Sequence, residues 1–463
     1  MLNYTTKEVI ADRDSLVINP CKTCQPVGAM YAALGVHACL PHSHGSQGCA
    51  AFHRMYLTRH FKDPIQASTS SFTEGASVFG GGSNLKTAAK NIMDIYNPDI
   101  IAVHTTCLSE TIGDDLNALL TDITPTLPEG KYIVHCNTPS YSGSHINGFF
   151  NMVNGFLKYL VKPATKANGK LAIFPGWGNP GDYAELKRLL NLMQVPFIML
   201  PDTDGVVDTP LTGTYEMYPA GGTKISDIQD MGNCKASLGL GTTISTPCVN
   251  FFEKSTKIKG DVLPYPMGIQ ASDDFIMKLQ AVSGTEVPKE IEYERGQLVD
   301  MMTDTHQYTY EKKAAIYGDP DTVLGIMQFC LELGMIPKYC ITGTPSEFFE
   351  SEGKALLTKY GVEGCTVQAA TQLNTTTDLF LLHQWIKNDP VDILLGGTHG
   401  KYIARAEDIP LVRMGFPIID RYVHYHMPLV GYRGAIHMLD KITNALMDYQ
   451  DSHCDEKDVE MVM

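Results

Sequence analysis

The stretch LKTAAKNIMDIYNPDIIAVHTTCLSETIGDDLNALL, residues 85–120, contains the pattern that decides the fold class. Its first part places apolar side chains at helical spacing, namely Leu85, Ala88, Ala89, Ile92, Met93 and Tyr96. Asn97-Pro98 is expected to end this helix, and the apolar run DIIAV (99–103) is typical of a buried strand. The segment SETIGDDLNALL (109–120) predicts a second helix with Ser109 or Thr111 as its N-cap. Alternating amphipathic helices and short apolar strands indicate a parallel sheet.

Two later passages repeat this alternation. The first predicts a strand at 171–174, a helix near 183–193 and a strand at 197–200. The second predicts a strand at 314–317, a helix ended by Gly334, and a strand at 339–342. The sequence therefore predicts an α/β protein of three doubly wound domains with largely parallel sheets. We expect these domains at 1–165, 166–310 and 311–463.

Composition limits the classes of function. The chain has 463 residues, of which 44% are hydrophobic and 19% charged, as expected of a globular protein. Its formal net charge of −15 argues against a nucleic-acid partner. No apolar run has the ~20 residues that a membrane span needs, and the opening residues MLNYTTKEVIADRD contain no signal-peptide core. We therefore expect a cytoplasmic protein that spans no membrane.

The cysteines are unevenly distributed. Of the 12, six come before residue 140, namely Cys21, Cys24, Cys39, Cys49, Cys107 and Cys136. In a cytoplasmic protein such cysteines are thiols, metal ligands or catalytic groups rather than disulfides. The chemistry is therefore expected in the N-terminal third.

Three of these cysteines lie in segments that suit a ligand site. Cys24 belongs to NPCKTCQPVGA (19–29), Cys49 ends HSHGSQGC (42–49), and Cys107 ends the strand-like run IIAVHTTC (100–107). A thiolate at the carboxyl end of a parallel strand, facing a helix N-terminus, lies where such sheets bind ligands. Three thiolates suit an iron–sulfur cluster, but any one of these cysteines taken alone is more often a small buried hydrophobe. Their wide spacing matches no compact ferredoxin pattern, so the residues alone leave both interpretations open.

Several longer motifs carry a family resemblance. Those around the cysteines are NPCKTCQPVGA (19–29), HGSQGC (44–49), TTCLSETIGDD (105–115) and TPSYSGSH (138–145); the others are SFTEGASVFGGGSN (71–84), ERGQLVDMMTD (294–304) and GFPIIDR (415–421). In this order and over nearly the whole chain, they resemble the beta chains of nitrogenase molybdenum–iron proteins. The resemblance implies an oxidoreductase subunit of an α2β2 heterotetramer. Electrons would pass from an ATP-dependent iron protein through a P-cluster to the molybdenum–iron cofactor, which the alpha chain holds, for reduction of dinitrogen to ammonia.

The same resemblance assigns residues to the P-cluster. It implies that Cys24, Cys49 and Cys107 bind an [8Fe-7S] cluster shared with three cysteines of the alpha chain, with Cys49 as the bridging thiolate. Ser140 matches a serine whose oxygen joins one iron when the cluster is oxidised. No catalytic residue of this chain is implied.

Two further sites are implied by the resemblance. Phe79 matches an aromatic residue at the surface that docks the iron protein; by itself, a phenylalanine is more often a core residue. Asp300 and Asp304, one helical turn apart, match carboxylates at the contact between two beta chains. With Asp63 and the Lys62 carbonyl of the other beta chain, they would hold a divalent cation, Fe or Ca²⁺. The alternative is a solvated acidic helix face.

Some residues depart from the family pattern or carry weaker signals. Phe52 stands where relatives often have Tyr, and Cys21 is expected to neighbour the Cys24 loop rather than to bind zinc. Gly80–Gly82 lacks the spacing of a nucleotide loop and is interpreted as a backbone surface. The histidines near Cys49 are interpreted as hydrogen-bonding or packed residues rather than ligands, namely His42, His44 and His60.

Two alternative functions stay open at this point. One is a cofactor-assembly scaffold homologous to the beta chain, although assembly relatives tend to lose part of the set formed by Cys24, Cys49, Cys107 and Ser140. The other is the beta chain of a vanadium or iron-only nitrogenase, which shares the cluster cysteines.

Overall fold

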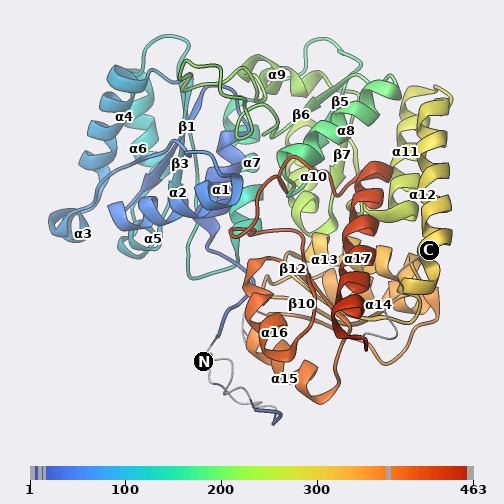
Figure 1. Cartoon of the computed structure of the whole chain (residues 1–463). Helices are drawn as coiled ribbons and strands as arrows, with labels where there is room; N and C mark the ends of the chain where they lie inside the picture. The colour runs from blue at the N-terminus through green and yellow to red at the C-terminus, as the bar shows by residue number, and fades with distance from the viewer. Residues whose placement is uncertain (1–5, 9–12, 14–16, 372–376, 456–463) are drawn as a thin grey trace. The chain divides into compact units, whose positions relative to one another are not determined.

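The structure is a computed structural model that describes residues 6–8, 13, 17–371 and 377–455. The opening segment from which we expect no signal peptide lies largely outside these residues. The chain divides into two compact units (Figure 1). The N-terminal unit comprises residues 23–263 and 422–426, and the C-terminal unit comprises residues 1–22, 264–421 and 427–463.

Each paired strand in the described residues runs parallel to its neighbours. The first sheet of the N-terminal unit has the order β2 (Ser68–Thr69), β1 (Cys39–His44), β3 (Ile100–Thr105), β4 (Tyr132–Cys136). Its second sheet has the order β6 (Phe197–Met199), β5 (Leu171–Phe174), β7 (Ala236–Leu240), β8 (Gly260–Leu263). The sheet of the C-terminal unit has the order β11 (Thr366–Ala369), β10 (Ile336–Thr342), β9 (Lys313–Tyr317), β12 (Ile393–Gly396), β13 (Leu411–Arg413).

Helices alternate with these strands along both units. Those of the N-terminal unit are α1 (Gln25–Leu34), α2 (Gln47–Phe61), α3 (Glu74–Phe79), α4 (Gly82–Tyr96), α5 (Cys107–Ile112), α6 (Leu116–Ile123), α7 (His145–Leu160), α8 (Pro180–Leu192), α9 (Ile225–Asp230) and α10 (Thr242–Thr256). Those of the C-terminal unit are α11 (Gly268–Ser283), α12 (Lys289–Thr309), α13 (Pro320–Glu332), α14 (Phe349–Tyr360), α15 (Leu379–Asn388), α16 (Lys401–Glu407) and α17 (Gly431–His453). The predicted α/β class with parallel sheets is confirmed; the domain boundaries at 165 and 310 stay a prediction.

The stretch 85–120 folds largely as expected, with one correction. Helix α4 ends at Asn97, whose φ of 43° is left-handed, and strand β3 follows. The single helix predicted over 109–120 is wrong, because Gly113, at φ 78°, ends α5 and α6 begins separately. The expected N-cap is also wrong: Thr106 caps α5, and the Ser109 side chain completes its capping box. Cys107 is therefore the first residue of a helix.

The first sheet and its helices form the core beneath the candidate site. Strands β1, β3 and β4 share a hydrophobic cluster with α4 and α6, whose members are Leu40, Leu85, Ala89, Ile92, Met93, Ile101, Val103, Leu116, Leu120, Ile123 and Ile133. In Figure 1 this sheet is drawn in shades from blue to turquoise, and its strands β1 and β3 lead into α2 and α5, which carry Cys49 and Cys107.

Helices α1 and α7 approach each other backbone to backbone, because glycines remove the intervening side chains. A Cβ atom built on Gly28 would lie 1.7 Å from the carbonyl oxygen of His145. A Cβ atom built on Gly148 would lie 1.8 Å from the carbonyl oxygen of Gln25. The N-terminus of α1 is thereby fixed against the first turns of α7.

The Gly28→Ala substitution is expected to destabilise the protein strongly. Its new methyl group would overlap a helix backbone that cannot move away alone, so we expect a loss of about 3 kcal/mol or more in the free energy of unfolding. Thermal denaturation of the purified protein measures this loss. Gly75→Ala is the matched control, since its Cβ would meet only the Thr73 hydroxyl at 3.8 Å. Equal melting temperatures for both variants would contradict the prediction.

A search of the described helices finds none that is both long and apolar enough to cross a bilayer.

Candidate functional site

Three of the four predicted cluster residues follow strands of the first sheet. Cys49 lies in the first turn of α2, which comes after β1, and Cys107 begins α5 directly after β3. Ser140 lies in the turn between β4 and α7. Because these strands are parallel neighbours, their carboxyl ends lie at the same edge of the sheet. The sheet thus brings the three segments together.

Cys24 reaches the site from α1, where it is the N-cap residue. The backbone N–H of Thr23 donates to His145 Nδ1 at 3.3 Å, and the His145 N–H donates to the Thr23 carbonyl at 2.9 Å. These bonds tie the Cys24 segment to the start of α7. Burial raises the pKa of the Cys24 thiol, and the nearby Cys49 raises this pKa further.

The three thiols share a half-buried setting and form no disulfide. A fully buried thiol is inert, whereas a partly exposed one can be reached by a metal. Soft thiolate sulfur is the ligand that iron–sulfur clusters use, so the donor set fits such a group. Within the described residues, no three His, Cys, Asp or Glu side chains are gathered as a complete metal site.

His53 is a neighbour of the site that the sequence analysis missed. It lies one turn after Cys49 on α2, and its Nε2 is 3.5 Å from Cys24 Sγ. Burial lowers the pKa of His53 to about 4, so the ring is neutral at pH 7. Its Nδ1 is buried without a hydrogen-bond partner among the described residues. The i, i+4 spacing from Cys49 is the signal that could have found it.

Gln25 is a second missed residue, and it fixes the Ser140 turn. Its Nε2 donates to the carbonyls of Pro139 and Ser142, at 3.2 and 2.9 Å, on either side of Ser140. Its Oε1 accepts a bond from Asn151 Nδ2 at 3.1 Å. The residue after Cys24 therefore holds the loop that presents the Ser140 hydroxyl.

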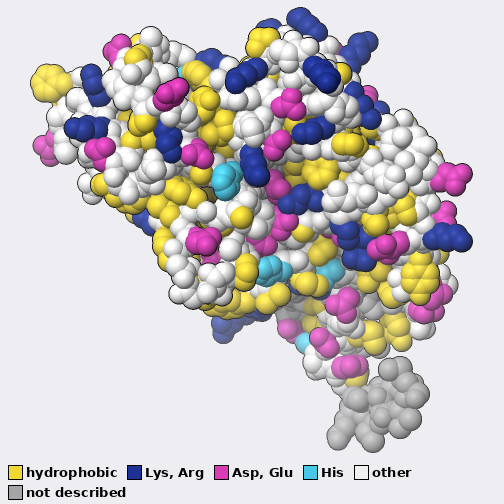
Figure 2. Space-filling view, turned by 90° about the horizontal axis from the view of Figure 1, so that it is seen from above, with side chains coloured by type: hydrophobic (Ala, Val, Ile, Leu, Met, Phe, Trp, Pro, Cys, Tyr) yellow, Lys and Arg dark blue, Asp and Glu magenta, His cyan; other side chains and the backbone are white. Residues whose placement is uncertain are grey.

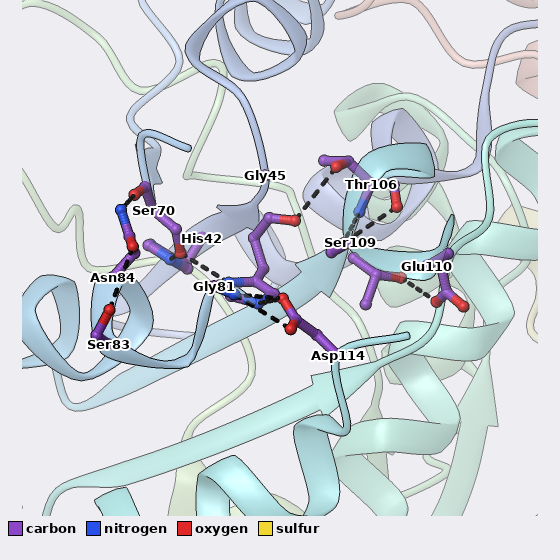
Figure 3. A network of polar contacts seen from close by, with 12 residues as sticks. His42, Gly45, Ser70, Gly81, Ser83, Asn84, Thr106, Ser109, Glu110 and Asp114 are labelled. Atoms are coloured by element: carbon purple, nitrogen blue, oxygen red, sulfur yellow. Dashed lines mark hydrogen bonds and ion pairs between the residues drawn. The ribbon is translucent and has the colours of Figure 1, made fainter. Parts of the chain in front are cut away.

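A network of polar contacts joins β1 to the segments that follow β2 and α5 (Figure 3). His42 bridges the hydroxyls of Ser68 and Ser70, and His44 joins Ser70 to Asp114. Burial lowers the pKa of His42 to about 3 and lowers the pKa of His44 as well. His60 bonds to Asn179 Oδ1 at 2.8 Å. The interpretation of these three histidines as hydrogen-bonding residues is confirmed.

Phe79 is an exposed residue and not a core one. It ends α3 with 90% of its surface exposed, next to Val78 at 75%. Hydrophobic side chains reach the surface in several places on the face shown in Figure 2, where acidic and basic side chains lie among them. Gly81, two residues further on, is buried, and its backbone N–H donates to the Asp114 carboxylate.

The four predicted cation ligands lie in the two units. Asp300 and Asp304 are both exposed on α12. Lys62 is the left-handed C-cap of α2, at φ 65°, and Asp63 follows it. Burial raises the pKa of Asp63, and His426 opposes this shift. The two pairs belong to different units, and a cation held by both stays a prediction.

The structure also shows where Cys21 and Phe52 lie, two residues that the sequence analysis singled out on weaker grounds. Cys21 packs in the hydrophobic core of the C-terminal unit with Tyr317 and Ile341, and Cys24 belongs to the N-terminal unit. The expectation that Cys21 neighbours the Cys24 loop stays a prediction. Phe52 is half-exposed on α2, and its ring packs against those of His53 and Tyr56.

Comparison with known proteins decides the family. Residues 24–447 match the family described as nitrogenase component 1 type oxidoreductase. The chain belongs to this family. The match includes Cys24 at its first residue and extends into α17.

Curated relatives of this nitrogenase family cover the chain at full or nearly full length. The nitrogenase molybdenum–iron protein beta chain of Clostridium pasteurianum is 54% identical and covers 100% of both chains. The chain of the same name from Nostoc sp. is 38% identical over 95% of this chain and 85% of its own length. That from Methanothermobacter marburgensis is 38% identical over 93% of this chain and 95% of its own.

Solved structures agree with these relatives. A chain of "Nitrogenase Cp1 at pH 6.5" is 54% identical, covers 100% of both chains and superposes with a TM-score of 0.97. A chain of "Nitrogenase Cp1 at pH 5" has a TM-score of 0.68 at 15% identity and covers 97% of this chain and 93% of its own, which shows a shared fold alone.

Proposed function

We propose that this chain is the beta subunit of a nitrogenase molybdenum–iron protein. One observation supports the proposal: Cys49, Cys107 and Ser140 each follow one of three neighbouring parallel strands, and Cys24 Sγ lies 3.5 Å from Nε2 of His53 on the helix that carries Cys49. These residues lie in a member of the nitrogenase component 1 family whose relative of that name is 54% identical over its full length. The subunit would relay electrons from an iron protein towards a molybdenum–iron cofactor in the alpha chain, for reduction of dinitrogen to ammonia.

In this proposal, Cys24, Cys49 and Cys107 hold one side of an [8Fe-7S] P-cluster that alpha-chain cysteines complete. When bound, the cluster accepts and passes on electrons. His53 lies against the Cys24 sulfur, and its neutral ring adds no charge there. Gln25 orients the turn of Ser140, whose hydroxyl would join the cluster on oxidation. The complete site then requires the alpha partner, which would stabilise the folded chain by binding it.

Two surfaces follow from the same proposal. Residues 74–82, called here the docking segment, present the exposed Phe79 to the iron protein in a transient, ATP-dependent contact. Asp300 and Asp304 of one beta chain, with Asp63 and the Lys62 carbonyl of the other, would hold a divalent cation, because hard oxygen ligands suit Ca²⁺ or Fe²⁺. The assembly would be a cytoplasmic α2β2 heterotetramer.

Iron and acid-labile sulfide analysis tests the proposal. The chain is purified alone and with a co-expressed alpha partner, and both elements are measured per chain. We expect them in stoichiometric amounts only in the complex, because neither half-site closes a cluster alone. A stable, metal-free protein in both preparations would return the cysteines to the core and overturn the relay function.

A further inference from the structure

The Asp114 carboxylate lies where three segments of the N-terminal unit meet. Both of its oxygens accept from the backbone N–H of Gly81, at 3.1 and 3.0 Å. Its Oδ2 also lies 3.0 Å from Nε2 of His44, the last residue of β1. Asp114 itself comes directly after α5, whose C-cap is Gly113. Figure 3 shows the carboxylate aimed at the Gly81 backbone.

The segment that contains His44 contacts the segments that carry the proposed cluster residues. The Thr106 hydroxyl donates to the His44 carbonyl at 3.2 Å, and Thr106 is the cap that precedes Cys107. A Cβ atom on Gly45 would lie 2.0 Å from that hydroxyl, so the Gly45 backbone is in close contact with the Thr106 side chain. A displacement of His44 would therefore be passed on to the segments that carry Cys49 and Cys107.

The other partner of the Asp114 carboxylate, Gly81, belongs to the docking segment. Gly81 lies two residues after Phe79, and a Cβ atom there would meet the Phe72 ring at 2.0 Å. Phe72 packs edge-on against the His44 ring, with the centroids 4.8 Å apart. Gly80 has a φ of 92°, a conformation that favours glycine. The turn after Phe79 therefore packs against Phe72, and Phe72 packs against His44, the histidine to which Asp114 is bonded.

We propose that Asp114 is a positioning residue that couples the docking segment to the cluster-bearing ends of β1 and β3. The inference rests on the proposed function, because it assumes that Phe79 meets the iron protein and that Cys49 and Cys107 hold the cluster. One carboxylate receives donors from both sides, so a shift of Gly81 on docking changes the position of His44. A residue whose only role was to end α5 or to begin α6 would need no hydrogen bond to Gly81.

The test separates electron delivery through docking from reactivity of the cluster itself. Asp114→Asn keeps the shape of the side chain but removes its charge and replaces one acceptor oxygen with an NH2 donor, which would face the N–H of Gly81 or of His44. In the assembled protein, two rates are measured: electron transfer from the iron protein with ATP, and reduction of the oxidised cluster by a small low-potential reductant that needs no docking.

We expect the iron-protein-dependent rate at saturating iron protein to fall about tenfold or more, because displacement by about 1 Å is costly for an oriented transfer. The rate with the small reductant and the iron content should stay within about twofold of wild type. Asp122→Asn is the matched control, since it removes the same charge from an exposed position on α6. An Asp114→Asn protein with unchanged rates, or with both rates lowered equally, overturns the coupling.

His44 supplies a second pair of variants in case Asp114→Asn lowers the iron content. His44→Gln places an amide nitrogen near the position of Nε2 and keeps a donor for Asp114, whereas His44→Phe removes it. Slow electron delivery in the Phe variant, with rescue in the Gln variant, supports the coupling, and equal rates in the two overturn it. Wild-type protein that takes no electrons from the iron protein would overturn the proposed function instead.

Discussion

The Cys49→Ala variant of the assembled protein is expected to lose nearly all of the iron and acid-labile sulfide that this chain shares with its partner. Cys49 is the thiolate proposed to bridge the two halves of the cluster, and alanine offers no ligand in its place. Mutation of a residue that only hydrogen-bonds to a metal ligand already lowers metal affinity or activity by about 10- to 100-fold. Loss of the ligand itself should lower dinitrogen reduction by about 100-fold or more.

Cys365→Ala is the matched control for this experiment. Cys365 is also a half-buried free thiol, but it precedes β11 at the amino end of a strand in the C-terminal unit. Its removal should leave iron, sulfide and activity unchanged. Full iron content in Cys49→Ala, or equal losses in both variants, would contradict the assignment of Cys49.

The Phe79→Ala variant is expected to weaken capture of the iron protein without loss of clusters. An aromatic side chain that is 90% exposed in the free subunit can bury nearly its whole surface in a partner. Interface hot spots of this kind contribute about 2 kcal/mol or more on truncation, so the apparent KM for the iron protein should rise about 30-fold. Titration of dinitrogen or proton reduction with the iron protein measures this change.

The control for Phe79→Ala is Tyr402→Ala, which truncates an aromatic residue that is 52% exposed on α16 of the C-terminal unit. This variant should keep the wild-type KM. Because Phe79 makes few contacts within its own chain, iron content and thermal stability should also be unchanged in Phe79→Ala. An unaltered KM would remove Phe79 from the docking surface.

The strands and most helices could be predicted from the sequence, because their patterns are local. Strand β5 has the predicted bounds, and α4 ends at the predicted Asn97. The helix over 109–120 could not be predicted correctly, since its break depends on the left-handed Gly113 and on Asp114, whose carboxylate is bonded to residues outside the helix. Such a bond leaves no periodic signal in the sequence.

In the candidate site, too, local patterns could be predicted and contacts between distant segments could not. Cys107 could be singled out because a thiol at the end of a predicted strand is recognisable, whereas the proposed roles of Cys24, Cys49, Cys107 and Ser140 came from the family resemblance. His53 could have been found from its i, i+4 spacing from Cys49, but Gln25 could not, because its partners lie in a distant segment, the turn around Ser140. A glutamine at the start of a helix carries no signal of a special role in the sequence. Only the folded chain shows that Gln25 holds the Ser140 turn.

The backbone contact between α1 and α7 has a consequence for biosynthesis. Cys24 is the first of the proposed cluster residues to leave the ribosome, but α7, against which its segment is fixed, ends only at Leu160. The intervening parallel strands pair non-locally and form late. A nascent chain shorter than this therefore offers separate thiols rather than a site. If these thiols hold the proposed cluster, its iron is expected to bind only after α7 has folded against α1.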